Sequence, residues 1–486
     1  MYVGIDIGTS SVKAVLLDPD QRVLDSASEP LVVSRPQPGF SEQDPAQWWQ
    51  ATLAVLDRLA ASRKPAMRAL RGIGLSGQQH GAVLLDAADA VLRPAILWND
   101  VRSHRECMEL EEREPRLRRI TGNITAPGFT APKLLWVARH EPEIFARTRR
   151  VLLPKDYVRL LLTGEAVSDM SDASGTAWLD VARRDWSDEA LAATDMDRSY
   201  MPRLVEGSGP SGTLRAALAE RFGIEGEVVV AGGGGDNAAS ACGIGAVRPG
   251  SAFVSLGTSG VLFASTERFA PNTGGAVHAF CHAVPHTWHQ MGVILSATDS
   301  LEWLARLLQS DAATLVGALG EELRAPSPAL FAPYLAGERT PHNSAELRGG
   351  FASLGHEADR AALTQAVLEG VAFAFRDCRE ALEAAGTRIE RAWAVGGGAR
   401  SLLWVRILAN VLRRPMDLPD HAESGGAFGA ARLALCAATG ADPATVCAPP
   451  AVARTIEPDE TLASAYDQAF ERYRILASGL KQMVTP

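Results

Sequence analysis

Apolar residues gather in short stretches typical of strands, and several stretches end in a glycine-rich polar turn. Near the start of the chain, apolar residues over 2–7 and 12–17 flank the turn Gly8-Thr9-Ser10, which predicts a β-hairpin. The same sequence of strand, Gly-Thr-Ser turn and strand recurs over 251–263. This internal repeat predicts two similar halves, with a boundary near residue 245.

Between the predicted strands, apolar residues recur at helical spacing. Asp44 can cap a helix and Pro45 suits its first turn, ahead of Trp48 and Leu53 at helical spacing. Further helices are expected over most of 103–162, over 297–308, over 363–385 and, with small residues suited to close packing, from Gly425 onward. The polar segment 168–176 is predicted to be a turn-rich loop. Strands that alternate with helices indicate an α/β fold.

A strand predicted over 70–75 ends in a polar tip that contains Gln79 and His80. In α/β proteins such tips carry binding residues, because strand ends are rigid and their loops face a crevice. Amide and imidazole groups suit the hydroxyls of a sugar. A single histidine is more often structural than functional, so this tip alone does not decide between the two. The second tip, over 94–100, calls for the same caution.

The middle of the chain contains an apolar strand from Val228, four glycines over 232–235, and then Asp236 and Asn237. Four glycines cost backbone entropy on folding and need a reason, such as a ligand that approaches closely. Asp236 could act as the general base for a sugar hydroxyl in phosphoryl transfer. Alternatively, Asp236 caps the helix that follows, and the two roles are compatible.

The two Gly-Thr turns expose consecutive backbone N–H groups and a hydroxyl, which is a natural cradle for phosphate. An ordinary hairpin is the better interpretation of one copy. Two copies favour phosphate binding, at Thr9 in the first turn and at Thr258 and Ser259 in the second. Asp6 precedes the first turn and would reach a Mg²⁺ ion that bridges phosphate oxygens.

A third glycine turn, over 396–398, lies between a predicted strand and a predicted helix. Such a turn at a helix N-terminus can admit a flat adenine or a phosphate. The spacing of a dinucleotide-binding fold is absent, and the chain contains no Gly-x-x-x-x-Gly-Lys-Ser/Thr, which excludes a P-loop. Alone, this glycine turn is weak evidence for a nucleotide.

Histidines and a cysteine crowd together over 278–289, at His278, Cys281, His282, His286 and His289. Their spacing matches no standard zinc framework. The segment alternates like two strands around a Pro-His turn, so a hairpin is the preferred interpretation.

Composition narrows the class of protein. A chain of 486 residues is too long for one core, so at least two domains are expected. A net charge of -9 argues against a nucleic-acid partner. Six cysteines without Cys-x-x-Cys spacing suit free thiols in a reducing cytosol. No signal-peptide pattern begins the chain and no apolar segment is long enough for a bilayer, so we expect a cytoplasmic protein without a membrane partner.

The segment 128–140 resembles the first signature of the FGGY carbohydrate kinases, which belong to the actin, hexokinase and sugar-kinase superfamily. The second signature, expected over 349–369, is imperfect, with Ser353 in place of a usual glycine and Ala362 in place of a usual polar residue. Other segments are similar to members that phosphorylate D-xylulose: 34–36, 41–45, 92–100, 152–157, 168–172 and 337–343. Those members typically have three glycines before the catalytic Asp-Asn pair, whereas this chain has four. The extra residue would either shift Asp236 or be absorbed upstream as a bulge.

The resemblance implies two ribonuclease-H-like domains around a deep cleft, with residues 1–245 binding the sugar and residues 246–486 binding ATP. It implies ATP-dependent phosphorylation of D-xylulose at O5, with Mg²⁺ and with Asp236 as general base. The implied roles are sugar contacts for Gln79, His80, Asp236 and Asn237, metal contacts for Asp6 and Asp236, phosphate contacts for Thr9, Thr258 and Ser259, and adenosine contacts for Gly397 and Gly398.

Rival functions remain open at this point. The nearest is a sister kinase that acts on ribulose, another ketose or a polyol, and Gln79 with His80 favours xylulose over these. A sugar or nucleotide sensor on the same fold would be expected to lack the base or to carry a helix-turn-helix, and neither is apparent. A chaperone-type ATPase would need a further peptide-binding domain. The oligomeric state is not readable from the sequence, and a homodimer is a hypothesis.

Overall fold

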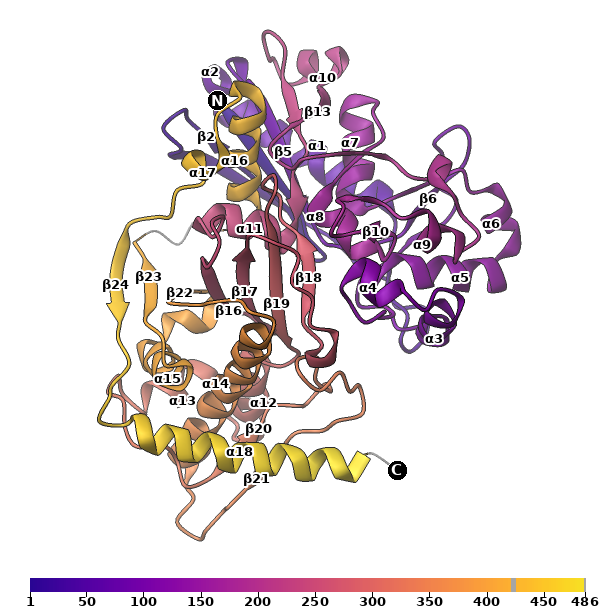
Figure 1. Ribbon diagram of the computed structural model, residues 1–486. Coiled ribbons are helices and arrows are strands. Elements are labelled where there is room, and N and C mark those ends of the chain that lie inside the picture. The colour runs from indigo at the N-terminus through magenta and orange to yellow at the C-terminus, as the bar shows by residue number, and fades with distance from the viewer. Residues whose placement is uncertain (421–424, 485–486) are drawn as a thin grey trace.

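The computed structural model describes residues 1–420 and 425–484, and it contains two mixed sheets of seven strands each. The first sheet consists of β1 (Tyr2–Ile7), β2 (Ser11–Leu17), β3 (Val23–Pro30), β5 (Gly72–Gly77), β13 (Pro210–Thr213), β14 (Val229–Ala231) and β15 (Gly234–Gly235). The second consists of β16 (Ala252–Leu256), β17 (Gly260–Thr266), β18 (His278–Cys281), β19 (Trp288–Ile294), β22 (Ala392–Val395), β23 (Met416–Pro419) and β24 (Val452–Ile456). The order is β13-β14-β5-β1-β2-β3 in the first sheet, with β15 also beside β5, and β18-β19-β17-β16-β22-β23-β24 in the second. The first sheet lies in the upper part of Figure 1, and the second lies below it, near the middle of the picture.

The internal repeat is visible in how the strands pair. In the first sheet β1 is antiparallel to β2 and parallel to β5. In the second sheet β16 is antiparallel to β17 and parallel to β22 in the same way. Both predicted hairpins are therefore confirmed, and each Gly-Thr turn lies at the carboxyl end of a central strand.

Helices cover these sheets, and the predicted α/β class is confirmed. In the first 250 residues they are α1 (Pro45–Ser62), α2 (Lys64–Arg68), α3 (His104–Arg113), α4 (Leu117–Thr121), α5 (Thr130–His140), α6 (Pro142–Arg147), α7 (Pro154–Thr163), α8 (Met170–Ala173), α9 (Asp188–Ala192), α10 (Ala216–Arg221) and α11 (Asp236–Ile244). They continue as α12 (Thr298–Leu307), α13 (Ala312–Gly317), α14 (Arg360–Ala384), α15 (Leu402–Leu412), α16 (Gly426–Thr439), α17 (Pro443–Val446) and α18 (Ala463–Val484). The Asp44 carboxylate caps α1 as predicted, accepting a hydrogen bond from the Ala46 N–H at 3.0 Å.

Short paired strands connect the helices. The pairs are β4 (Glu42–Gln43) with β7 (Ala95–Ile96), β6 (Val83–Leu85) with β8 (Arg150–Leu152), β9 (Val167–Asp169) with β12 (Arg203–Val205), β10 (Leu179–Asp180) with β11 (Asp185–Trp186), and β20 (Leu330–Ala332) with β21 (Gly350–Ala352). Strand β8 interrupts the region that was expected to be mostly helical. Its partner β6 is distant in sequence, so local periodicity could not reveal it.

The prediction of a turn-rich loop over 168–176 is wrong. The segment contains the end of β9, the short helix α8 and a 3₁₀ turn over Ser174–Thr176, and nearly all of it is buried. Its polar residues are buried because Lys155 of α7 forms ion pairs with Asp169 and Asp172. Polar composition suggests an exposed loop only when no distant charge is available to pair with it.

Two helices, α11 and α16, lie between the sheets, and each contacts the sheet of the other half of the chain. Helix α16 follows most of the second sheet in sequence but packs on β1, β5 and β14 of the first. Helix α11 packs against α16 on one side, while its Ala241 and Ile244 share a core with Phe253 and Phe263 of the second sheet. Figure 1 shows the resulting order of first sheet, α16, α11 and second sheet. The domain boundary near residue 245 stays a prediction. Helix α16, residues 426–439, packs on the first sheet although it lies beyond that boundary in the sequence.

Glycines allow α16 to approach its neighbours at backbone distance. A Cβ atom on Gly4 would lie 1.8 Å from the Ala427 carbonyl oxygen, and one on Gly74 would lie 1.8 Å from that of Ala430. The small-residue helix predicted from Gly425 onward is thus confirmed, starting at Gly426.

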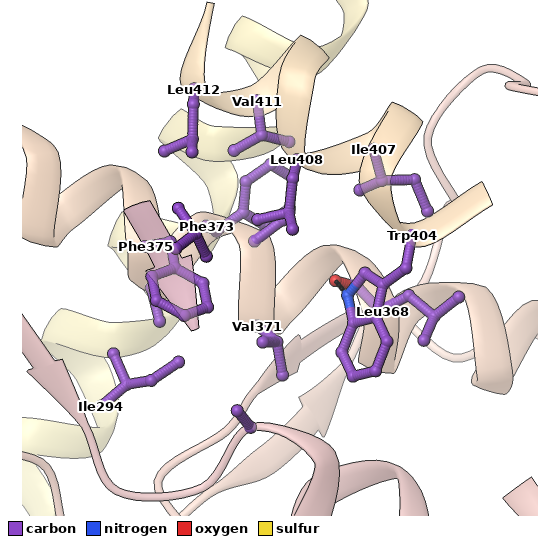
Figure 2. Packing of buried hydrophobic residues seen from close by; sticks show 14 of the residues in the cluster. Ile294, Leu368, Val371, Phe373, Phe375, Trp404, Ile407, Leu408, Val411 and Leu412 are labelled. Atoms are coloured by element: carbon purple, nitrogen blue, oxygen red, sulfur yellow. Dashed lines mark hydrogen bonds between the residues drawn. The ribbon is translucent and has the colours of Figure 1, made fainter. Parts of the chain in front are cut away.

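The core of the second half is built around α14, which α15 and α18 cover. Figure 2 shows buried side chains of α14, α15 and β19 packed together, with Phe375 of α14 beside Ile294 of β19. The Trp404 indole N–H donates to the Leu368 carbonyl at 3.0 Å, so the one polar atom of this ring is satisfied. Each such fully buried side chain contributes about 1.5–3 kcal/mol, which makes this core a rigid support for β16.

Of the helices in the described ranges, none has the length and apolarity of a membrane span.

Candidate active site

The carboxyl ends of β1, β5 and β15 bring the first group of predicted site residues together. Asp6 of β1 lies opposite Ser76 of β5, and the Ser76 hydroxyl donates to the Asp6 carboxylate at 2.8 Å. Gly235 of β15 pairs with Gly77 of β5, and Asp236 follows directly. The polar tip after β5, with Gln79 and His80, therefore lies beside the glycine run.

The glycine strand contains a bulge upstream of Asp236. Val230 pairs with Ile73, but Gly234 pairs with Ser76, so three residues of the glycine strand oppose two of β5. Gly233 has φ +73°, and a Cβ atom there would lie 2.0 Å from the Leu75 carbonyl oxygen. Only glycine fits that conformation and that contact. The strand pairs with β5 again at Gly234 and Gly235, directly before Asp236.

Asp236 is the first residue of α11 rather than its cap, which is Gly235. The Asp236 carboxylate accepts hydrogen bonds from the Asn237 backbone N–H at 2.7 Å and from the Asn237 side-chain amide at 2.9 Å. Burial raises the pKa of Asp236 to about 6, and the nearby charge of Asp6 adds to this shift. A carboxylate with this pKa is mostly ionised at neutral pH yet a stronger base than an exposed aspartate.

Asp6 and Asp236 together form the candidate metal site. Burial raises the pKa of Asp6, and the Ser76 hydrogen bond opposes that shift. Residues 1–420 and 425–484 contain no group of three or more side chains able to hold a metal by themselves. Two carboxylates nevertheless fit Mg²⁺, which binds through one or two carboxylates and takes its other ligands from water and phosphate.

Both carboxylates lie at helix N-termini. Asp236 begins α11, and a Cβ atom on Gly426, the first residue of α16, would lie 3.0 Å from the Asp6 carboxylate. The N-terminal end of a helix carries partial positive charge, so it stabilises carboxylates and phosphates.

The polar tip after β5 presents an acceptor nitrogen on His80. The backbone of His80 has φ +70°, and its Nδ1 lies 2.6 Å from the Gly175 carbonyl oxygen. Burial lowers the pKa of His80 to about 3, so the ring is neutral. Because Nδ1 carries the proton donated to Gly175, Nε2 is left as an acceptor for a hydroxyl. The Gln79 side-chain N–H group donates to the Ser171 carbonyl at 3.2 Å, which leaves its amide oxygen for a ligand.

The first Gly-Thr turn has its hydroxyl engaged and its backbone donors available. Thr9 donates to the Gln78 side-chain oxygen at 3.0 Å and accepts from the Trp98 indole at 3.0 Å. The N–H groups of Thr9 and Ser10 have no acceptor in the described part of the chain. Backbone N–H groups, rather than the threonine hydroxyl, are the phosphate donors that this geometry offers.

The second group of predicted residues gathers at β16 and β22. Thr258 and Ser259 are exposed, and the Thr258 carbonyl accepts a hydrogen bond from Ala297 ahead of α12 at 2.8 Å. Gly396 has φ +91°, and a Cβ atom on Gly398 would lie 2.8 Å from that of Leu256. The glycine turn therefore contacts β16, the strand that precedes Thr258. Gly397 is exposed, with open space around it.

No hydrogen bond or ion pair among the described residues joins the two groups directly. Strand β18 links the second sheet to the first group, because the Phe280 ring centroid lies 6.3 Å from that of His80. The Phe129 ring also lies beside His80, with the ring centroids 4.9 Å apart.

The crowded histidine segment forms the predicted hairpin, as β18 and β19. His289 stacks on Phe263 with ring centroids 4.5 Å apart, and His282 Nε2 lies 3.2 Å from the Ala246 carbonyl oxygen. These two side chains are used in packing.

Family models match both halves of the chain. Residues 1–243 match the N-terminal domain of the FGGY family of carbohydrate kinases, and residues 252–438 match its C-terminal domain. The chain belongs to the FGGY family. Sugar kinases of this family generally use ATP and Mg²⁺.

Several relatives of this FGGY kinase are xylulose kinases. The chain is 50% identical over 439 residues to the xylulose kinase of Escherichia coli strain K12, covering 90% of each chain. It is 47% identical to that of Klebsiella pneumoniae over the full length of both. Among solved structures, it superimposes on a xyloylose kinase from Brucella ovis with TM-score 0.98 and 58% identity, and on the xylulose kinase from Rhodospirillum rubrum with TM-score 0.91 and 31% identity, in each case over 99% of both chains. The two-domain sugar-kinase fold is thereby confirmed.

Two cationic side chains near His80, Lys133 and Arg339, were not among the site residues predicted from the sequence. Lys133 is completely buried and donates to the His80 and Gly128 carbonyls at 2.8 and 2.7 Å, which fixes the tip after β5. Arg339 comes from the second half, and its charge contributes to the lowered pKa of His80. Within the described residues no carboxylate lies at ion-pair distance from Arg339. Both lie in segments that carry the family resemblance, 128–140 and 337–343, which was the available signal.

Proposed function

We propose that this FGGY kinase transfers the terminal phosphoryl group of ATP to O5 of D-xylulose and releases ADP and D-xylulose 5-phosphate. The observation that carries the proposal is the placement of Asp236 beside Gln79 and His80, in a chain 47–50% identical to two xylulose kinases. The roles that the next paragraphs give to individual residues are part of the same proposal.

Asp236 acts as the general base. It accepts the proton of the sugar hydroxyl while the hydroxyl oxygen bonds to phosphorus and the bond from phosphorus to the ADP oxygen breaks. The pKa of about 6 leaves the carboxylate ionised and basic at neutral pH. Asp6 and Asp236 would hold Mg²⁺, which supplies neutralisation of phosphate charge when bound.

The sugar is oriented by groups whose hydrogen-bonding sense is fixed. His80 Nε2 accepts from one hydroxyl, because its Nδ1–H donates to Gly175, and the Gln79 amide oxygen accepts from another, while one N–H of that amide donates to Ser171. Asn237 stays beside Asp236 through its own two hydrogen bonds and contacts the same sugar.

The nucleotide is held mainly by the second half. Backbone N–H groups at Thr258 and Ser259 and at Thr9 bind the phosphates, and Gly397 and Gly398 admit the adenosine. Residues 1–245 thus carry the sugar and residues 246–486 the ATP. Closure of the two halves would exclude water and limit ATP hydrolysis without sugar. The enzyme is proposed to be cytoplasmic, without nucleic-acid or membrane partners, and a homodimer is the proposed assembly.

The first test is a coupled ADP-release assay with Mg-ATP against D-xylulose, D-ribulose, L-ribulose, D-fructose, xylitol and glycerol, with a no-sugar control. A large kcat/KM preference for D-xylulose supports the proposal. Preference for another sugar or polyol keeps the kinase and rejects xylulose. Binding of sugar and ATP without sugar-dependent ADP release favours the sensor.

A further inference from the structure

Five charged side chains lie completely buried beneath the glycine run, and the chemistry proposed above uses none of them. Lys155 is at the centre, with its Nζ 2.6 Å from Asp156, 2.7 Å from Asp169 and 3.1 Å from Asp172. Arg159, one turn further along α7, lies 3.8 Å from Asp156. We call these five residues the buried charge cluster.

The buried charge cluster is balanced if one carboxyl is protonated. Burial raises the pKa of Asp172 well above its usual range, and Lys155, 3.1 Å away, opposes that shift. Burial of an unpaired charge is costly, so these five side chains hold one another in place.

Ser171 connects Asp169 of the buried charge cluster to the site. Its hydroxyl donates its only hydrogen to the Asp169 carboxylate at 2.5 Å. The lone pairs of the same oxygen therefore face the Gly235 N–H, which donates to it at 3.1 Å. Gly235 directly precedes Asp236. The carbonyl of Ser171 accepts the hydrogen bond from the Gln79 amide.

The cluster also holds the other end of the bulge. Arg159 donates to the Gly232 carbonyl and, at 3.3 Å, to the Val167 carbonyl. The bulge over 231–233 is thus fixed by Arg159 at one side and by Ser171 at the other. No side chain fits at Gly235, where a Cβ atom would lie 2.6 Å from the Gln79 amide nitrogen.

We propose that Ser171 is a positioning residue, held by the buried charge cluster, that sets Asp236 at a fixed place relative to Gln79. This inference rests on the proposed function, since it assigns Asp236 and Gln79 their roles in it. One residue touches the backbone before the base through its hydroxyl and the sugar-binding amide through its carbonyl. The two contacts can therefore be separated by mutation.

The test is the kinetics of Ser171→Ala. The substitution removes the hydroxyl and frees the Gly235 N–H, but the carbonyl that holds Gln79 stays. We expect kcat to fall about 10- to 100-fold, because small displacements of a catalytic group cost that much. KM for D-xylulose and for ATP should change less than about threefold, since the binding contacts are retained.

Two further variants separate positioning from general loosening. Ser211 is also a buried serine, and its hydroxyl donates to the Val230 and Ala231 carbonyls of the same glycine strand without touching Gly235. Ser211→Ala is expected to lower the thermal unfolding temperature about as much as Ser171→Ala while leaving kcat within twofold. Ser171→Thr keeps the hydroxyl and should recover most of the lost kcat. Unchanged kcat in Ser171→Ala, or equal losses of kcat in the two alanine variants, would overturn the proposal.

The outcome does not depend on which sugar is turned over. Wild-type turnover of D-xylulose tests the proposed function, whereas the ratio of variant to wild-type kcat, taken with whichever sugar the wild type prefers, tests the role of Ser171. A crystal structure of Ser171→Ala provides a second measurement. We expect the backbone over 235–237 to move and the Gln79 side chain to stay in place, and an unmoved backbone would contradict the inference.

Discussion

At the scale of single residues, the site depends on how few hydrogen-bonding choices each side chain has. His80 donates its Nδ1–H to the Gly175 carbonyl, Gln79 donates one of its two amide N–H groups to the Ser171 carbonyl, and Asp236 accepts from Asn237. His80 Nε2, the Gln79 amide oxygen and the basic Asp236 carboxylate are left as acceptors, and the second N–H of Gln79 is left as a donor. That set suits a polyhydroxylated substrate that must lose a proton from one hydroxyl.

Replacing the base should remove turnover but not nucleotide binding. We expect Asp236→Ala to lower kcat by about 10²- to 10⁴-fold, the range typical of general base catalysis. ATP affinity, measured by calorimetry, should change little because the phosphate turns are intact. A wild-type rate in this variant would rule out Asp236 as the base.

The raised pKa of Asp236 predicts the acid limb of the pH profile. The base must be ionised, and its pKa of about 6 lies above the usual aspartate value, so activity is lost as pH falls through about 6. The measurement is kcat/KM for the sugar between pH 4.5 and 8. Asp6→Asn should move the limb to lower pH, because the Asp6 charge contributes to the raised pKa. A limb near 4 in the wild type would contradict the burial argument.

At the scale of elements, α16 shows why small residues recur along one helix. It is packed between the first sheet and α11, and Gly429 lies so close to α11 that a Cβ atom would be 1.7 Å from the Ala239 carbonyl oxygen. No rotation of a side chain relieves a clash with backbone, so one of the helices would have to move.

Gly429→Ala is therefore expected to destabilise the protein by about 1–3 kcal/mol or more, despite the better helix propensity of alanine. Thermal or urea unfolding measures the change. Gly479→Ala is the matched control, because Gly479 is within α18 and no atom of the described residues lies within 4 Å of the place that a Cβ would take. This control should be neutral or slightly stabilising. Equal stability of both variants would mean that the two helices are not closely packed.

At the scale of the whole molecule, the two helices between the sheets place the two acidic groups at the junction of the halves. Asp236 begins α11, which shares a core with the second sheet, and Asp6 lies against the start of α16, which packs on the first. The first sheet holds both carboxylates, through β1 and β15 on β5, so relative movement of the halves would change their distance from Thr258 and Ser259 at the second sheet. Ligands that bridge the halves should hold them in one arrangement.

Binding of sugar should stabilise the folded chain as a whole. At a D-xylulose concentration of 100 times Kd, linkage predicts about 2.7 kcal/mol of added stability, seen as a rise in the thermal unfolding temperature. His80→Ala should reduce this rise, since it removes an acceptor for the sugar, while the rise caused by Mg-ATP is retained. If His80→Ala responds to xylulose as the wild type does, His80 is not in the sugar site.

Much of the fold followed from local signals. The two hairpins, the capped helix α1 and the long helices α12, α14 and α16 were all predicted, because periodicity and turn residues report directly on strands and helices. The segment 168–176 was predicted wrongly, because its burial depends on Lys155, whose ion pairs with Asp169 and Asp172 cannot be read from the sequence around them.

The family, the α/β class and the identity of the candidate base follow from motifs and spacings within short stretches of the sequence. The bulge at Gly233, the free acceptor at Nε2 of His80 and the link from Gln79 to Gly235 through Ser171 became known only from the folded chain. Each of these depends on contacts between segments distant in the chain. Such contacts form only when the whole molecule folds.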